Sequence, residues 1–238
     1  MLFRQLFDRE SSTYSYLIAD TLTREAILVD SVIDQIDRDL QLIRELDLTL
    51  KYCLETHIHA DHITGAGELR DRTNCLGIVP INAEAKCADR FIKHDEEIKL
   101  GQVEIKAIAT LGHTDSHMAY LINGKRVLTG DALLIRGCGR TDFQNGNAGT
   151  LYDSVTSNLF SLPDETLVYP AHDYHGRTVS TIGEEKQWNP RFRNNNRQDF
   201  IKLMDNLDLS YPRKMMEAVP ANQGCGKVNS IASTASLK

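Results

Sequence analysis

The chain has 238 residues, which suits one large domain or two small ones, and 41% of them are hydrophobic, enough for a sizeable core. Its formal charge is −6, and this excess of acidic residues argues against nucleic acid as a partner because phosphate binding needs a basic face. No apolar run approaches the roughly 20 residues of a membrane span, and charged residues at 8–10 interrupt any signal peptide, so we expect a cytoplasmic, bacterial protein.

The first third of the chain alternates short apolar runs with amphipathic stretches. Residues 25–32 predict a buried strand, and residues 34–46 predict a helix because their apolar side chains recur at helical spacing. Residues 50–56 predict a second buried strand, which leads directly into the sequence THIHADH. A helix at 63–72 and a strand at 76–81 are expected to follow.

The remaining elements include several neighbouring strands. We expect strands at 103–110, 117–124, 125–131 and 165–172, and helices from Thr150 and over 197–207. Asn123-Gly124 predicts a tight hairpin, which makes a purely parallel sheet unexpected. Thr150 and Asp153 are expected to cap the first of these helices. Many strands with interspersed helices indicate a layered α/β protein.

The five cysteines are widely spaced, and no C-x-x-C pair indicates a zinc knuckle or a redox couple. We therefore expect reduced thiols that act mainly as small buried side chains. Cys138, in RGCGRTDF, could line a pocket or fill a tight loop between glycines. The GCG stretch and Asn145-Gly146 predict a loop with positive φ.

Predicted strand ends deliver polar residues that can converge on one rim, at Thr56-His57, Gly112-His113, Gly130-Asp131 and Ala171-His172. The first of these continues as H-x-H-x-D-H, formed by His57, His59, Asp61 and His62. Imidazole and carboxylate groups are the usual ligands of a divalent metal ion. Several unpaired, partly buried titratable groups would otherwise be costly, so the pattern predicts a metal site.

The T-H-x-H-x-D-H motif and the later G-H-T, G-D and P-A-H motifs resemble the metallo-β-lactamase fold superfamily in order and spacing. The resemblance spans residues 15–175 at least. It implies a four-layer αββα sandwich with the metal at one rim of two packed sheets. This superfamily includes hydrolases with two zinc or iron ions, such as glyoxalase II, and also oxygen-using iron proteins.

Three further stretches, at 133–146, 169–191 and 218–226, resemble the persulfide dioxygenases. They lie outside the generic metal motif and therefore separate this branch from its relatives. With them the resemblance covers nearly the whole chain. It implies a single domain over 1–238, in which 175–238 is a family-specific C-terminal extension packed on the rest.

The resemblance implies a non-haem iron enzyme that oxidises glutathione persulfide with O2 and water to sulfite and glutathione. One Fe(2+) per chain would be held by His57, His113 and Asp131, a 2-His-1-carboxylate face that leaves positions open for the sulfur donor and for dioxygen. A homodimer and a link to sulfide-oxidising or sulfurtransferase enzymes are further expectations. Neither a membrane nor a nucleic-acid partner is expected.

The other members of the generic motif are His59, Asp61, His62 and His172. In a dioxygenase they would orient the iron ligands through hydrogen bonds. In the alternative, a glyoxalase II-type dinuclear thioester hydrolase, they would help to bind two metal ions with Asp131 bridging. The motif alone leaves both open. Candidates for contacts to the charged groups of glutathione, each equally consistent with a solvated surface, are Tyr174, Arg177, Arg213 and Lys214.

Overall fold

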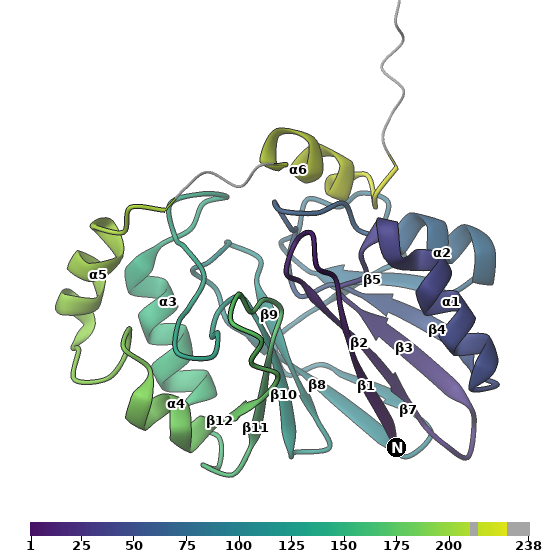
Figure 1. Ribbon diagram of the computed structural model, residues 1–238, viewed down its shortest axis with the longest axis horizontal. Coiled ribbons are helices and arrows are strands. Elements are labelled where there is room, and N and C mark those ends of the chain that lie inside the picture. The colour runs from purple at the N-terminus through teal and green to yellow at the C-terminus, as the bar shows by residue number, and fades with distance from the viewer. Residues whose placement is uncertain (210–213, 228–238) are drawn as a thin grey trace, which may run out of the picture.

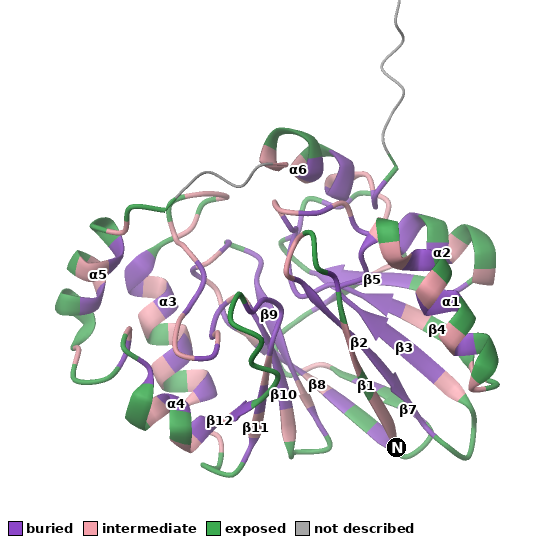
Figure 2. Cartoon of the chain, viewed as in Figure 1, coloured by how far each residue is buried: buried purple, intermediate pink, exposed green. Residues whose placement is uncertain are grey.

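In the computed structural model, which describes residues 1–209 and 214–227, two six-stranded sheets pack face to face. Helices cover the outer face of each sheet, so the chain forms the expected αββα sandwich (Figure 1). The core between the sheets contains buried side chains of both, among them Tyr16, Ile27, Leu54, Ile105 and Tyr120. Figure 2 shows that the helices turn their buried faces towards the sheets and their exposed faces outwards.

The first sheet has the order β1 to β6. Its strands are β1 (Leu2–Phe7), β2 (Tyr14–Ala19), β3 (Glu25–Val29), β4 (Thr49–Leu54), β5 (Leu76–Pro80) and β6 (Arg90–Ile92). The β1, β2 and β3 strands are antiparallel, whereas β3 to β6 are parallel. Helices α1 (Ile36–Glu45) and α2 (Ala66–Thr73) supply the crossovers that parallel neighbours require. Ile36, Leu40 and Ile43 of α1 are buried against this sheet, as their spacing predicts.

The second sheet has the order β12-β11-β10-β9-β8-β7. Its strands are β7 (Glu97–Leu100), β8 (Val103–Ala109), β9 (Met118–Ile122), β10 (Arg126–Gly130), β11 (Leu167–Pro170) and β12 (Ser180–Thr181). β9 and β10 form the predicted hairpin, with positive φ at Asn123 and Gly124 as a two-residue turn of this kind needs. β10 and β11 are parallel, so the sheet is mixed, as expected.

The outer side of the second sheet carries α3 (Ala148–Ser154), which continues as a π-helical turn, and α4 (Ile182–Trp188). Helix α5 (Arg197–Asp205) packs against α3 (Figure 1). Phe200 and Met204 bury α5 in the same apolar cluster as Leu151 of α3. Helix α6 (Met215–Gln223) instead lies over the end of the sandwich where the strands deliver their polar residues (Figure 1).

Several local predictions need correction. Helix α3 is capped by Asn147, whose side chain accepts a hydrogen bond from the backbone N–H of Thr150, and not by Thr150 with Asp153. The expectation of reduced cysteines is wrong for Cys87 and Cys225, which form a disulfide. The cysteines at 53, 75 and 138 are free and buried, as expected. Within the described part of the chain, no helix has the length and apolar character needed to cross a membrane.

Candidate metal centre

Three side chains from both sheets meet at one rim. His57 follows β4 of the first sheet, while His113 and Asp131 follow β8 and β10 of the second. One ligand atom from each lies within 4.8 Å of the others. Asp131 Oδ2 is 3.5 Å from His113 Nε2 and 4.0 Å from His57 Nε2. The structure therefore brings together the three residues that the sequence singles out as metal ligands.

Hydrogen bonds to the far side of each imidazole leave Nε2 free. Thr56 Oγ1 donates its hydrogen to Asp30 Oδ2 at 2.9 Å, so it accepts from His57 Nδ1, also at 2.9 Å. His113 Nδ1 is 2.7 Å from the carbonyl oxygen of Arg140, which can only accept. Both rings thus carry their proton on Nδ1 and present the Nε2 lone pair to the rim, as metal-binding histidines do.

Asp131 supplies the third ligand atom. Its Oδ1 accepts from His172 Nδ1 at 2.7 Å, which leaves Oδ2 facing the two Nε2 atoms. Burial alone would raise the pKa of Asp131, but His172 and His113 hold it below its ordinary value, so the carboxylate is ionised. Two imidazole nitrogens and one carboxylate oxygen fit a divalent transition metal, with the geometry of a facial triad.

His117 was not singled out from the sequence, yet it contacts all three segments of the triad. It is fully buried, its Nε2 accepts the backbone N–H of Asp131 at 3.0 Å, and its Nδ1 donates to Thr110 Oγ1 at 2.8 Å. Its ring stacks on His57 with centroids 5.0 Å apart. Burial lowers the pKa of His117 to about 3, so this ring is neutral. It is the first residue of the predicted strand at 117–124, four positions after the histidine of the G-H-T motif, and the sequence pattern gave it no role of its own.

His172 lies between two carboxylates. Its Nδ1 is bonded to Asp131 Oδ1, and its Nε2 lies 2.9 Å from Asp61 Oδ2. Burial alone would lower the pKa of His172, but the Asp131 and Asp61 carboxylates hold it well above the ordinary value. Both ring nitrogens therefore donate hydrogen bonds. An imidazolium of this kind has no lone pair to offer a metal ion.

The neighbouring side chains of the motif are also tied to one another. Asp61 Oδ2 accepts from His62 Nδ1 at 2.9 Å in addition to His172. His59 Nε2 lies 3.2 Å from Asp30 Oδ1, and although burial would lower its pKa, Asp30 raises it to about 9. One ligand atom each from His59, Asp61 and His62 also lie within 4.8 Å of one another. These atoms are close enough for a metal, and within the described part of the chain both ring nitrogens of His59 and Nε2 of His62 are buried without a hydrogen-bond partner.

A cavity of about 600 Å³ opens beside the triad. Its lining includes His57, His113 and Asp131, and also Tyr174 and Arg177. The loop that follows β10 forms one wall and packs tightly on the ligands. At Gly139 a Cβ atom would lie 2.6 Å from the carbonyl oxygen of Asp131 and 2.7 Å from His113 Nδ1, so the position needs glycine.

Comparison with known proteins places this arrangement in a family. The model of the metallo-beta-lactamase superfamily matches residues 8–172. The mitochondrial persulfide dioxygenases ETHE1 of Mus musculus and Homo sapiens are 48% and 47% identical to this chain, each over 95% of it and 89% of the relative. The crystal structure of ETHE1 from Myxococcus xanthus is 57% identical, with a TM-score of 0.93 over 95% of this chain and 100% of that one.

The chain belongs to the persulfide dioxygenase family of the metallo-beta-lactamase superfamily. The family and fold expected from the sequence motifs are thereby confirmed. The glyoxalase II-type alternative has less support, because these relatives carry the dioxygenase name.

Two of the four residues predicted to contact the substrate line the cavity. Tyr174 is 69% exposed at the cavity and stacks on His172, with 5° between the rings. Arg177 lines the cavity, and its guanidinium donates to the carbonyl oxygen of Ile135. Lys214 is not among the lining residues, and its Nζ pairs with Glu10 at 2.7 Å. Arg213 lies outside the described residues.

Cys138 lines the cavity as a thiol. Burial raises its pKa to about 12, and its Sγ lies 3.7 Å from Met204 Sδ. The loop around it has positive φ at Arg136 and Asn145, so the expectation holds for Asn145 but not for the glycines of the GCG stretch. Such a thiol is a packing group and not a thiolate nucleophile.

Sequence reasoning missed three further arginines of the cavity, which are Arg136, Arg140 and Arg191. Arg136 pairs with Glu184 and Glu185 of α4, and Arg140 pairs with Asp142. Arg191 pairs with no carboxylate within the described part of the chain. All three lie in the stretches at 133–146 and 169–191 that resemble the persulfide dioxygenases, and this position could have indicated them as substrate contacts.

Proposed function

We propose that this protein is a persulfide dioxygenase that oxidises glutathione persulfide with O2 and water to sulfite and glutathione. The observation that carries the proposal is the triad of two Nε2 lone pairs and one carboxylate oxygen at the wall of an open cavity. Support also comes from relatives named persulfide dioxygenase at 47–48% identity over nearly the whole chain.

We further propose one Fe(2+) per chain, held by His57 Nε2, His113 Nε2 and Asp131 Oδ2. Iron bound there would supply redox chemistry and open coordination positions for a persulfide sulfur and for dioxygen. The protein's own part is to fix these three atoms. Thr56 and the Arg140 carbonyl oxygen set the tautomers of the two imidazoles, and His172 holds Oδ1 so that Oδ2 points to the ion.

The role of His59, Asp61, His62 and His172 in this proposal is to orient the ligands. His172 uses both nitrogens on carboxylates and therefore does not compete for the metal. In a dinuclear hydrolase one of these nitrogens would have to lose its proton and face a second ion. The two carboxylate contacts of His172 support the proposal of a single ion.

Glutathione recognition falls to the arginines of the cavity. The tripeptide carries two carboxylates, and guanidinium groups bind carboxylates through paired charge-assisted hydrogen bonds. Arg191 suits this role because its guanidinium forms no ion pair with a carboxylate of the described chain. Arg177 lines the same cavity. A volume of about 600 Å³ lies within the usual range for a ligand of this size.

Two side-by-side assays test the proposal. Protein purified without oxygen should contain close to one iron per chain and should consume O2 only when glutathione persulfide is supplied. A glutathione thioester should not be hydrolysed. Two tightly held metal ions together with thioester hydrolysis, and no O2 uptake, would establish the glyoxalase II-type alternative instead.

The organisation expected from the sequence completes the proposal. We propose one domain over 1–238, with 175–238 as a family-specific extension, and this is supported for 182–205 because α4 and α5 share an apolar cluster with α3 and the second sheet. A cytoplasmic location, a homodimer and a link to sulfide-oxidising or sulfurtransferase enzymes stay predictions.

A further inference from the structure

The C-terminal helix binds the metal loop, defined here as residues 57–64, through one side chain. Asn222 is 3% exposed, and its Nδ2 donates to the carbonyl oxygens of His59 at 2.9 Å and His62 at 2.8 Å. Its Oδ1 accepts the backbone N–H of Thr64 at 2.8 Å. All the hydrogen bonds of this carboxamide therefore go to one loop, whose shape they fix from His59 to Thr64.

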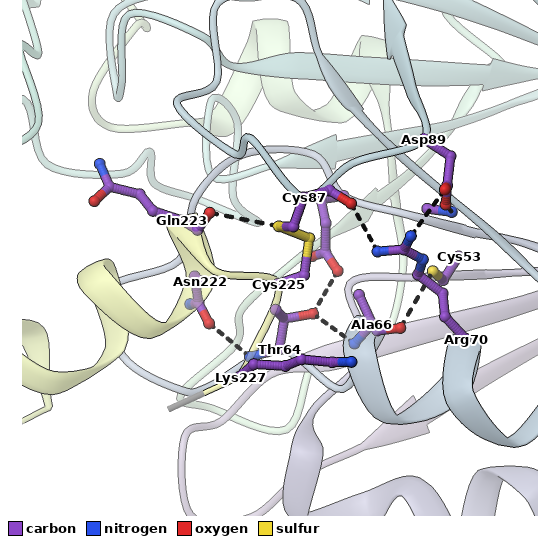
Figure 3. Close-up of a disulfide and its surroundings, with 12 residues drawn as sticks. Cys53, Thr64, Ala66, Arg70, Cys87, Asp89, Asn222, Gln223, Cys225 and Lys227 are labelled. Carbon is purple, nitrogen blue, oxygen red and sulfur yellow. Dashed lines mark hydrogen bonds and ion pairs between the residues drawn. A yellow bond between two sulfur atoms is a disulfide. The ribbon is translucent and has the colours of Figure 1, made fainter. Parts of the chain in front are cut away.

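A disulfide attaches this helix to the body of the protein three residues further on. Cys225 is bonded to Cys87, which lies in the loop between β5 and β6 (Figure 3). The carbonyl oxygen of Cys225 accepts the backbone N–H of Gly67 at 2.8 Å. A Cβ atom at Gly67 would lie 2.6 Å from that oxygen, so the segment packs closely on the start of α2.

The other attachments of α6 are few. Its buried residues are two alanines and Asn222, whereas α5 buries the large side chains Phe200 and Met204. Met216 is 87% exposed, and Val219 adds one contact with a small apolar cluster. Little apolar surface therefore holds α6 in place, and the covalent bond to Cys87 carries much of its attachment.

A movement of the metal loop would displace the residues of the triad. Asp61 of this loop is bonded to His172 Nε2, and His172 Nδ1 is bonded to Oδ1 of the ligand Asp131. The loop also begins with the ligand His57. A continuous set of hydrogen bonds thus connects Asn222 with the carboxylate of the triad.

We propose that Asn222 is a positioning residue for the metal loop, and that Cys87–Cys225 is a thiol-sensitive latch that determines how firmly Asn222 holds this loop. The latch opens when a small-molecule thiol, RSH, attacks as its thiolate. Cys87 is the more exposed of the two sulfur-bearing residues and is the site of attack, so Cys225 leaves as a thiolate and takes up a proton.

The exchange ends with a second thiol. It attacks the mixed disulfide on Cys87 and releases RSSR, so that two RSH are oxidised while the protein disulfide is reduced to two cysteine thiols. The same disulfide, RSSR, closes the latch in the reverse direction. This inference needs only the metal site and a thiol, and it does not depend on which persulfide the enzyme oxidises.

The first experiment compares the wild-type protein with the latch closed and open. After treatment with glutathione disulfide, thiol titration of the unfolded protein should find only Cys53, Cys75 and Cys138, and two more thiols should appear after reduction with dithiothreitol. Hydrogen exchange of a peptide over 58–66 is then followed in both states without metal. Reduction should speed this exchange about tenfold, while a peptide from β8 and β9 should be unaffected.

The second readout is metal retention. Co(2+)-loaded protein is mixed with excess EDTA, and loss of the Co(2+) absorption band gives the release rate. Reduction should speed release about tenfold, in line with the usual effect of losing an outer hydrogen-bond partner of a metal ligand. Because Co(2+) release does not require turnover, the result is independent of the dioxygenase assay.

Two variants separate the latch from the residue it positions. Cys87→Ser should match reduced wild-type protein and should no longer respond to dithiothreitol. Asn222→Asp keeps the acceptor for Thr64 but cannot donate to the carbonyl oxygens of His59 and His62, so it should release Co(2+) fast in both redox states. Asn206→Asp is the matched control, because Asn206 is exposed just after α5 and its side chain donates to the carbonyl oxygen of Lys202, far from the metal loop.

Any of three results would overturn the proposal. These are five free thiols after treatment with glutathione disulfide, equal exchange and release rates in oxidised and reduced wild-type protein, or an Asn222→Asp variant that behaves like Asn206→Asp. Thermal unfolding of each variant checks that it is folded. If a variant does not fold, the two redox states of the wild-type protein still decide the question.

Discussion

The two halves of the histidine and aspartate cluster differ in how their polar atoms are used. In the triad, each imidazole makes its hydrogen bond through Nδ1 and leaves Nε2 free at the cavity. In the other half, His172 donates from both nitrogens and Asp61 accepts from two histidines. Both halves are built from histidine and aspartate, and the difference lies in the partners of His172, since His62 also leaves its Nε2 without a hydrogen-bond partner within the described part of the chain.

This difference shows that groups outside the motif influence which of its atoms can bind a metal ion. A threonine hydroxyl and a backbone carbonyl oxygen, neither of which is part of the motif, set the tautomers of His57 and His113. Two carboxylates raise the pKa of His172. The lone pairs that the cluster offers to a metal ion therefore depend on neighbours of the motif as well as on the motif.

The largest effect is expected when Asp131, the oxygen ligand of the triad, is replaced. Asp131→Ala should bind no iron and should reduce persulfide-dependent O2 uptake to background, because two imidazoles alone hold iron poorly and His172 loses its partner. Metal analysis and an oxygen electrode measure both effects. Asp95→Ala, which removes an exposed carboxylate paired with Lys106, is the control and should behave like the wild type. Full uptake in Asp131→Ala would disprove the ligand assignment.

A milder change tests the other half. Asp61→Asn removes the charge between His62 and His172, and we expect iron affinity to fall about 10–100-fold as for other outer partners of metal ligands. Iron content at saturation should stay at one per chain. Titration with iron against a competing chelator measures both quantities. If the wild-type protein held two ions and the variant one, the two halves would be equivalent after all.

A third change tests the open side of the triad. Arg191→Ala should raise the KM for glutathione persulfide about 10–100-fold, because a charge-assisted hydrogen bond contributes about 1.5–3 kcal/mol, while kcat changes little. Arg193→Ala is the matched control, since Arg193 is exposed and lies over the ring of Trp188. Steady-state O2 uptake distinguishes them. Equal KM values in both variants would remove Arg191 from the substrate site.

The smallest effect is expected at Cys138. A thiol whose pKa is about 12 stays protonated between pH 6 and pH 9, so it contributes no ionisation to the rate profile. Cys138→Ala should therefore keep the wild-type dependence of kcat/KM on pH, with slightly lower thermal stability from the lost packing on Met204. A pH profile that shifted in this variant would show that the thiol takes part in the reaction.

Much of the fold and of the triad could be predicted from the sequence. The predicted strand ends at His57, His113 and Asp131 indicated that these side chains meet at one rim, and Asn123-Gly124 indicated a hairpin. The strands β1, β2, β6, β7 and β12 and helix α4 were not predicted. β6, β7 and β12 are too short to show a clear hydrophobic period, and β2 is buried along its whole length, so it shows no alternation. Helix α6 has only small buried side chains and contains Pro220, so its pattern gave no helical signal.

Contacts between distant segments that no motif indicates could not be predicted. Cys87 and Cys225 are 138 positions apart among an odd number of cysteines, and no spacing indicates that they pair. Asn222 is an ordinary helical residue until the fold places it on the metal loop. The tautomer of His113 depends on a carbonyl oxygen of residue 140, which any amino acid would provide. Such partners become visible only in three dimensions.

The order of the ligands along the chain has a consequence for biosynthesis. His57 ends a strand of the first sheet, but Asp131 follows β10, deep in the second. A ribosome must therefore complete ten strands, and both sheets must pair, before the three ligand atoms can meet. A metal ion can therefore be held by all three ligands only after residue 131, just past the middle of the chain, has been made, and protein made without the metal should bind it later without renewed translation.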